Sequence, residues 1–247
     1  MLIGSVLDDP TRTLIEHQRL IAIHAGKYVA TSIIDRELRR HGILCKRLSR
    51  AARERDPIKR FRWQERMGAM GIDDEAGVVI DEMSFDGRVS GRRTGWAPQG
   101  QRAEVSKPFA RGKRHRVLAA LTTRGVEHIK IVEGAFCAAE VFDFVVELIM
   151  KGVLLSRDMG RGRWALTLDN ASVHKSEALR ELVETNGSYL NFLPRYSPDY
   201  TPIELVFGQV KARMRRERTS GLEGIWNAFG VNEEAARGSF RHAGWAY

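Results

Sequence analysis

Short apolar runs alternate with amphipathic segments from Val78 onward. The strand-like runs cover residues 77–81, 116–122, 126–134, 164–169 and 189–194, and only "TRG" separates the second from the third. That spacing predicts a β-hairpin. The helix-like segments are "AAEVFDFVVELIM", "KSEALRELVET" and "TPIELVFGQVKARMRRE". Strands that alternate with helices, together with one hairpin, predict an α/β fold with a mixed sheet flanked by helices. In the first of these helices we expect an inward stripe of Val141, Phe142, Val145, Leu148 and Ile149.

The chain has 247 residues and an excess of basic side chains. Forty Lys and Arg against 31 Asp and Glu give a net charge of +9, which favours a polyanionic partner, most simply nucleic acid. No apolar run is long enough to span a membrane, and the N-terminus lacks the pattern of a signal peptide. Two cysteines, Cys45 and Cys137, are too few for a disulfide framework or a zinc site. We expect an intracellular protein, in the nucleus if the source is eukaryotic and otherwise in the cytoplasm or nucleoid.

The basic charge is unevenly distributed along the chain. Residues 36–67 form a dense basic stretch, "GIDDEAG" breaks it, and we place a domain boundary there, between 1–69 and 70–247. Within the first part, "TLIEHQRLIAIHAG" and "TSIIDRELRRHG" predict two short helices; the second has a Thr or Ser cap, buries Ile34 and Leu38, and ends at Gly42. A helix, a tight turn and a basic helix form a helix-turn-helix DNA reader, although an ordinary helical hairpin with solvated arginines has the same pattern. As DNA contacts we expect Thr31, Ser32, Arg36, Arg39 and Arg40.

Two acidic residues directly follow strand-like segments. Asp81 ends "GVVID" and Asp169 ends "WALTLD". Functional groups gather at the carboxyl ends of strands in open α/β sheets, but a single Asp there is also a common cap or turn former. Glu82 points to the face of the strand opposite to Asp81, so both cannot serve one site. We interpret Asp199, in "SPDY", as a turn residue.

A third acid, Glu204, lies at the start of the last predicted helix. In "TPIE", Thr201 can act as N-cap, Pro202 suits the first helical position, and Glu204 completes a capping box. Together with Asp81 and Asp169, it would supply the hard oxygen ligands that Mg²⁺ or Mn²⁺ prefers, in a site able to bind two ions. A Glu that caps cannot ligate a metal at the same time. We therefore predict that Glu204 points into the acidic pocket and that Thr201 alone caps the helix.

Three motifs in order, "VVIDEMSF", "LTLDNASVHKS" and "LPRYSPDYTPIELVF", resemble those of the mariner superfamily of cut-and-paste DNA transposases. The 34 residues between Asp169 and Glu204 match the spacing of that family. The resemblance implies a ribonuclease H-like catalytic domain in which Asp81, Asp169 and Glu204 are the catalytic residues and the ligands of two Mg²⁺ or Mn²⁺ ions. It implies cleavage of DNA at transposon ends and joining of the 3′-hydroxyl to target DNA, by a homodimer bound to DNA.

The basic insertion between the first two strands falls where members of the family carry a loop that clamps the partner subunit. The resemblance therefore implies that Trp96 belongs to a dimer clamp, whereas the simpler interpretation is a basic loop with one anchoring Trp. We expect further DNA contacts from the basic residues around it, which are Arg92, Arg93, Arg111, Lys113 and Arg114.

The sequence departs from the family pattern at three places. Arg195 replaces a Pro and Thr201 an Asn, and the N-terminal part has room for one helix-turn-helix unit where the family has two. His174 matches the second motif, and we expect it to form a structural hydrogen bond rather than to act in catalysis. The alternatives are a truncated or domesticated DNA-binding protein without cleavage activity, and another ribonuclease H-like nuclease such as a junction resolvase.

Overall fold

In the computed structural model, the strands among the described residues form one mixed sheet in the order β3-β2-β1-β4-β5. β1, β2 and β3 pair antiparallel, and β4 and β5 run parallel to β1. The mixed sheet and the hairpin of β2 and β3 confirm the sequence prediction. The bounds of the strands are Gly77–Phe85 for β1, His115–Thr122 for β2, Gly125–Glu133 for β3, Ala165–Leu168 for β4 and Tyr189–Phe192 for β5.

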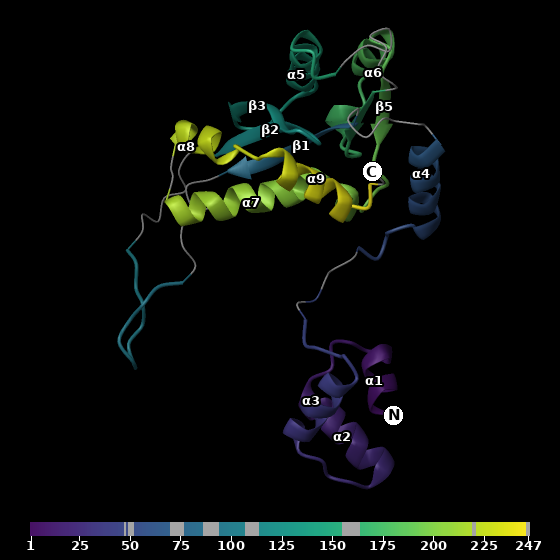
Figure 1. Ribbon diagram of the computed structural model, residues 1–247, viewed down its shortest axis with the longest axis vertical. Helices are drawn as coiled ribbons and strands as arrows, with labels where there is room; N and C mark the ends of the chain where they lie inside the picture. Colours follow the sequence, from purple (N-terminus) through teal and green to yellow (C-terminus); the bar gives the residue numbers. More distant parts are fainter. Residues whose placement is uncertain are drawn as a thin grey trace. The chain divides into compact units, whose positions relative to one another are not determined.

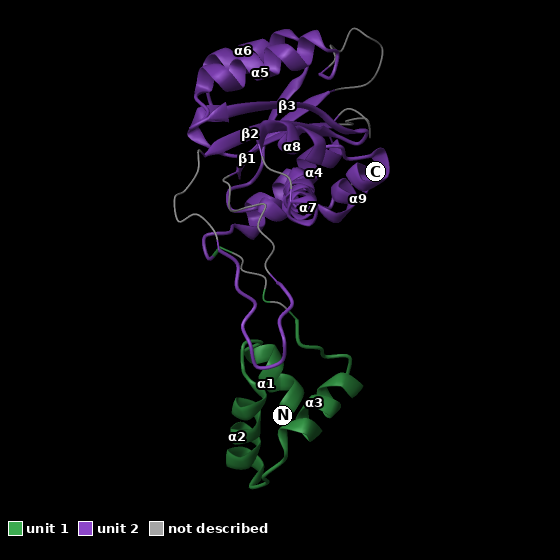
Figure 2. Cartoon of the chain, turned by 90° about the vertical axis from the view of Figure 1, so that its left-hand side faces the viewer, with its two compact units in different colours: residues 1–52 green, residues 53–247 purple. Residues whose placement is uncertain are grey.

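Two compact units make up the chain, residues 1–52 and residues 53–247 (Figure 2). The division differs from the boundary predicted near residue 70, because helix α4 (Pro57–Ala69) packs on the second unit through Arg60 and Trp63. The basic composition of α4 resembles that of the first unit, but its buried face belongs to the second. The structure describes residues 1–46, 48, 52–69, 77–85, 94–106, 114–154, 164–218 and 221–245.

Helices cover both faces of the sheet (Figure 1). On one face, α5 (Ala138–Met150) and α6 (Glu177–Thr185) pack against Val78, Ile80 and their neighbours. On the other, α7 (Pro202–Glu217), α8 (Gly221–Ala228) and α9 (Glu233–His242) pack against Val79, Met83 and their neighbours. The alternation along β1 follows from the two-residue period of a strand. None of the helices in the described part of the chain is long and apolar enough to cross a membrane.

The buried stripe of α5 includes Phe144, which was not predicted, and lacks Phe142, while the predicted Ile149 is only partly buried against the same core. Phe144 is buried and Phe142 is only partly covered. Burial at 141, 144, 145 and 148 follows the three- and four-residue spacing of one helix face, whereas position 142 lies beside that face. Phe142 also has helical spacing to Val145 and Ile149, so the periodicity of the sequence alone did not distinguish Phe142 from Phe144.

The N-terminal unit contains α1 (Leu2–Asp8), α2 (Leu14–Ala25) and α3 (Thr31–Arg40). The two predicted helices are present, and α1 is additional. Ile34 and Leu38 are buried as expected, and the arginines of α3 are exposed. The predicted Thr or Ser cap of α3 is wrong, because its N-cap is Ala30 and no side chain caps it. The helix ends before Gly42, whose positive φ of 72° lets Ile43 N–H bond back to the Leu38 carbonyl.

Candidate active site

The parallel pairing of β1 and β4 brings Asp81 and Asp169 to the same end of the sheet. Val79 pairs with Thr167, and each acid lies two residues further along the chain. Asp81 therefore does not end its strand as predicted. β1 continues to Phe85 paired with β2, whereas β4 stops at Leu168. Beyond that point β1 has no hydrogen-bonded neighbour on this side in the described part of the chain, and the free edge leaves room for a site.

Glu204 reaches the same place from the first turn of α7. The helix begins at Pro202, as predicted, but the Thr201 side chain makes no capping hydrogen bond, so the prediction that Thr201 alone caps the helix is wrong. Thr201 is buried in the cavity wall, and only its carbonyl accepts from the Glu204 N–H, at 3.2 Å. The Glu204 side chain faces the cavity, as the sequence predicted.

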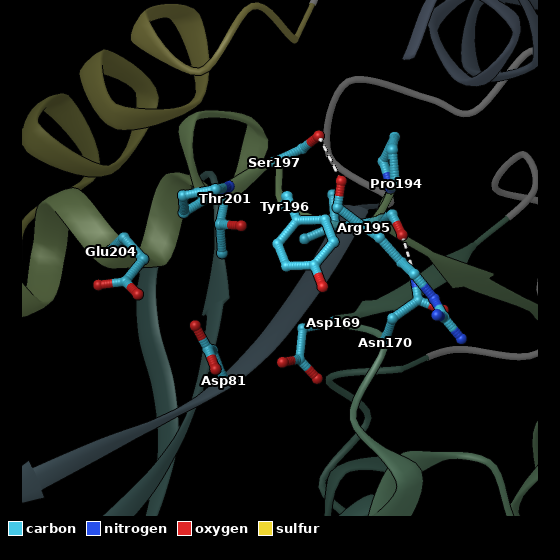
Figure 3. Close-up of a pocket in the computed structure, with 11 residues that line it drawn as sticks. Asp81, Asp169, Asn170, Pro194, Arg195, Tyr196, Ser197, Thr201 and Glu204 are labelled. Atoms are coloured by element: carbon cyan, nitrogen blue, oxygen red, sulfur yellow. Dashed lines mark hydrogen bonds between the residues drawn. The ribbon is translucent and has the colours of Figure 1, made fainter. Parts of the chain in front are cut away.

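A cavity of about 510 Å³ collects the three carboxylates, which face a common space (Figure 3). Arg195 brings a positive charge to its wall. Tyr196 is 54% exposed and has a φ of 57°, a left-handed conformation that costs a non-glycine residue energy and is concentrated at functional sites. The cavity is lined by Asp81, Asp169, Asn170, Leu193, Pro194, Arg195, Tyr196, Ser197, Pro198, Thr201 and Glu204.

The pKa of Asp81 is strongly perturbed. Burial raises it from 3.8 to about 7, against the effect of the Glu82 N–H, which donates to Asp81 Oδ1 at 2.7 Å. The negative charges of Glu204 and Asp169 raise the pKa further. The three acids are thus close enough to repel one another, which is the electrostatic condition that a divalent cation relieves.

His174 fixes the orientation of Asp169. Its Nδ1 lies 2.6 Å from Asp169 Oδ1, which also accepts the Ala171 N–H at 2.9 Å. The hydrogen bond from His174 lowers the pKa of Asp169 despite partial burial. Burial of His174 opposes its charge, but the hydrogen bond and charge of Asp169 raise its pKa above the ordinary value. The expected structural hydrogen bond of His174 is confirmed, and no described residue donates to Asp169 Oδ2, which remains available to a ligand.

The donor set fits a hard divalent cation, because carboxylate oxygens are the ligands that Mg²⁺ and Mn²⁺ prefer. Among the described residues, however, no three potential metal ligands already lie close enough together to hold an ion. Binding a cation would therefore require small movements of these side chains toward one another.

A model of the DDE superfamily endonuclease family matches residues 77–223, more than half of the chain. This chain belongs to the DDE superfamily endonucleases. Its fold is shared with solved structures of Mos1 at low sequence identity. The Mos1 mariner paired end complex with Mn is 18% identical, with a TM-score of 0.70 over 97% of this chain and 73% of that one. The pre-cleavage Mos1 transpososome is 18% identical with a TM-score of 0.67 over the same shares. A comparison with curated proteins gives no match.

These findings confirm the predicted ribonuclease H-like fold and the resemblance to mariner transposases. Of the other predicted site residues of this DDE-family chain, Ser32, Arg36, Arg39 and Arg40 are exposed on α3, and Thr31 is partly buried. Arg39 pairs with Asp35 and Arg40 with Glu37. Arg114 and Trp96 are exposed. The predicted DNA contacts that lie outside the described residues are Arg92, Arg93, Arg111 and Lys113.

Sequence reasoning missed several residues of the site. Tyr196 and Asn170 lie inside quoted motifs but were assigned no role. Asp199 is not merely a turn residue, because it accepts hydrogen bonds from Arg55 and Arg60. The three-residue spacing of Arg60 and Trp63 places both on one face of a helix, which could have indicated that this face packs against another part of the chain.

Proposed function

We propose that this chain is a metal-dependent DNA transposase that cuts DNA at transposon ends and joins the freed 3′-hydroxyl to target DNA. The observation that carries the proposal is the cavity that collects carboxylates from β1, from the end of β4 and from α7. Membership in the DDE superfamily endonucleases supports it. The structural neighbours support it further, because they include Mos1 in a pre-cleavage transpososome and in a strand transfer complex.

Asp81, Asp169 and Glu204 would hold two Mg²⁺ or Mn²⁺ ions. Mos1 complexes contain Mn or Mg, which supports this choice of metals. When bound, such a pair stabilises the attacking and leaving oxygens of a phosphodiester during in-line displacement. Cation binding at neutral pH must displace the proton that the raised pKa places on Asp81, so metal affinity rises with pH.

Other residues in the cavity wall and behind it position the substrate and the acids. His174 holds Asp169 Oδ1, so the carboxylate presents Oδ2 to the cavity. Arg195 offers a cation to a phosphate of the DNA backbone. The exposed ring of Tyr196 offers a surface on which a base next to the cleaved bond can stack.

The remaining features suit binding of DNA by two subunits. In α3, the exposed arginines and Ser32 fit a recognition helix in the major groove. Helix α2 fits the first helix of such a pair, which supports the recognition helix. Trp96 is fully exposed within its own chain, which fits a contact with the partner subunit of a homodimer. Because its substrate is DNA, we propose that the protein acts in the nucleus of a eukaryotic source, or otherwise in the cytoplasm and nucleoid.

The test is DNA nicking by purified protein on DNA that bears the inverted repeats flanking its gene, with Mg²⁺ or Mn²⁺. Wild-type protein should nick, and Asp81→Asn, Asp169→Asn and Glu204→Gln should each lose nearly all activity. Asp143→Asn is the matched control, because Asp143 is an exposed acid of α5 on the opposite side of the sheet. Equal nicking by wild type and Asp81→Asn would refute the assignment.

The alternative is a DNA-binding protein that no longer cleaves. The net charge of +9 is its motivation, because a basic chain binds DNA whether or not it cleaves it. This alternative predicts salt-sensitive DNA binding without metal-dependent nicking, whereas a transposase should show both the binding and the nicking.

A further inference from the structure

Helix α4 packs directly on the loop that leads into α7. Arg60 donates two hydrogen bonds to Asp199, from Nη1 to Oδ1 at 3.0 Å and from Nη2 to Oδ2 at 2.7 Å. The same guanidinium lies 3.7 Å from the centre of the Tyr200 ring. Arg60 is 7% exposed, which is unusual for Arg unless the residue is paired. A bidentate, stacked and buried Arg fixes both position and orientation of the loop it contacts.

Trp63, one turn further along α4, contacts the same loop through its indole ring. Its ring stacks on Tyr200 with centres 5.2 Å apart and meets Trp245 edge-on at 5.8 Å. The Trp245 Nε1–H donates to the Tyr200 carbonyl at 2.9 Å. Tyr200 is thus held through its ring by Arg60 and Trp63 and through its backbone by Trp245.

The loop that these residues hold carries the third acid. Tyr200 directly precedes Thr201, the N-cap of α7, and Glu204 lies on the first turn of that helix. At the other end of the loop, Ser197 accepts the Tyr200 N–H at 3.0 Å and follows the strained Tyr196. Glu204, Thr201 and Tyr196 all face the acidic cavity (Figure 3). A shift of Tyr200 would therefore move one wall of the cavity.

The C-terminal end of α4 contacts β5, which neighbours the strand that leads to the second acid. Arg66 Nη2 donates to Asn191 Oδ1 at 3.3 Å, and Asn191 Nδ2 contacts Met67 Sδ at 3.2 Å. Asn191, on β5, also donates to Thr167 Oγ1 at 3.1 Å. Thr167 is on β4 and lies two residues before Asp169 in the chain. Contacts from α4 thus extend to two of the three segments that supply carboxylates.

We propose that α4 is a brace of the active site and that Arg60 and Trp63 are positioning residues, which hold Glu204 and Tyr196 where metal binding and DNA cleavage require them. The inference rests on the proposed function. Neither residue touches the cavity, so both act through Asp199 and Tyr200. Displacing a catalytic group by about 1 Å can lower a rate ~100-fold, so loss of the brace should affect turnover more than substrate binding.

The test compares Arg60→Gln and Arg60→Lys with Arg62→Gln. Arg62 is an exposed neighbour on the same helix, and its substitution removes the same charge, so a general loss of electrostatic DNA affinity is matched. Arg60→Gln should lower kcat for nicking ~10- to 100-fold relative to Arg62→Gln with little difference in KM. Arg60→Lys keeps the charge but loses the bidentate fork, and it should still lower kcat.

A readout independent of activity is Mn²⁺ affinity, measured by electron paramagnetic resonance without DNA. We expect both Arg60 variants to bind Mn²⁺ ~3- to 10-fold more weakly than Arg62→Gln, with circular dichroism spectra like that of wild type. The double variant Arg60→Gln/Asp199→Asn should be worse than Arg60→Gln alone by no more than the effect of losing the Arg55–Asp199 pair, which Arg55→Gln measures separately. If both Arg60 variants match Arg62→Gln in kcat and in Mn²⁺ affinity, the brace has no positioning role.

The outcomes separate this inference from the proposed function. Wild-type protein that binds Mn²⁺ but does not nick DNA would refute the transposase proposal, and the Mn²⁺ affinities of the variants would still decide the role of α4. Wild-type protein that neither nicks nor binds Mn²⁺ would overturn both. If Arg60→Gln fails to fold, Arg60→Lys and Trp63→Phe take its place, because each keeps most of the buried volume.

Discussion

Replacing Asp81 by Asn should stabilise the metal-free protein above neutral pH. The unfolded chain releases the Asp81 proton near the ordinary pKa of 3.8, whereas the folded protein retains it up to about 7. Between these values the folded state binds more protons than the unfolded state, so stability falls as pH rises and the full loss is present above about pH 7. At ~1.36 kcal/mol per pH unit the gap amounts to ~4 kcal/mol. Because Asp81 is only partly shielded from solvent, we expect ~2–4 kcal/mol.

The assay is chemical or thermal unfolding of wild type and Asp81→Asn between pH 4 and 8 in the presence of a chelator. At pH 8 the variant should be more stable by ~2–4 kcal/mol, or ~4–16 °C in Tm at the ~2–4 °C per kcal/mol typical of this size. The difference should shrink steadily toward pH 4. Adding Mn²⁺ at pH 8 should stabilise wild type much more than the variant, since the variant lacks one ligand charge.

Asp169→Asn provides the control of opposite sign. The hydrogen bond from His174 lowers the pKa of Asp169, so its contribution to stability is present above the unfolded pKa and is lost as pH falls through the folded one. Asp169→Asn should therefore destabilise the protein at pH 7. Parallel pH profiles for wild type and Asp81→Asn, or equal effects of the two substitutions, would refute the electrostatic account of the site.

Four further substitutions test other parts of the structure. His174→Gln should raise the Mn²⁺ concentration for half-maximal nicking ~10- to 100-fold by releasing Asp169, and an unchanged metal titration would contradict this role. Tyr196→Asn should leave Tm equal or higher, because Asn tolerates a φ of 57°, while weakening DNA binding in a fluorescence anisotropy titration; unchanged affinity would exclude the stacking role. Gly125→Ala should cost at least ~2 kcal/mol of unfolding free energy, since its φ is 138° and an added Cβ would lie 2.6 Å from the Val231 carbonyl oxygen. Gly208→Ala, in α7 with nothing within 4 Å, should instead stabilise by ~0.5–1 kcal/mol, and a similar denaturation midpoint for both variants would count against this packing.

Local sequence patterns determined the elements whose residues contact their near neighbours. The hairpin of β2 and β3, the start of α7 at Pro202 and the burial of Ile34 and Leu38 were all predicted, because turn chemistry and helical periodicity act over a few residues. Helices α1, α4, α8 and α9 were not predicted. Their patterns are short or dominated by charge, and packing on the rest of the chain supplies most of their stability.

The acids of the candidate site show where sequence and tertiary structure divide. Asp81, Asp169 and Glu204 could be selected from the motifs, and Glu204 could be aimed at the pocket because a capping Glu is unavailable to a metal. Their convergence needed the parallel register of β1 and β4 and the packing of α7 on the sheet, which involve residues far apart in the chain. The same kind of long-range contact extended β1 beyond Asp81 and joined α4 to the loop that leads into α7. Sequence thus determined which residues carry the chemistry, and tertiary packing decided where each of them lies, because only packing relates segments that do not touch along the chain.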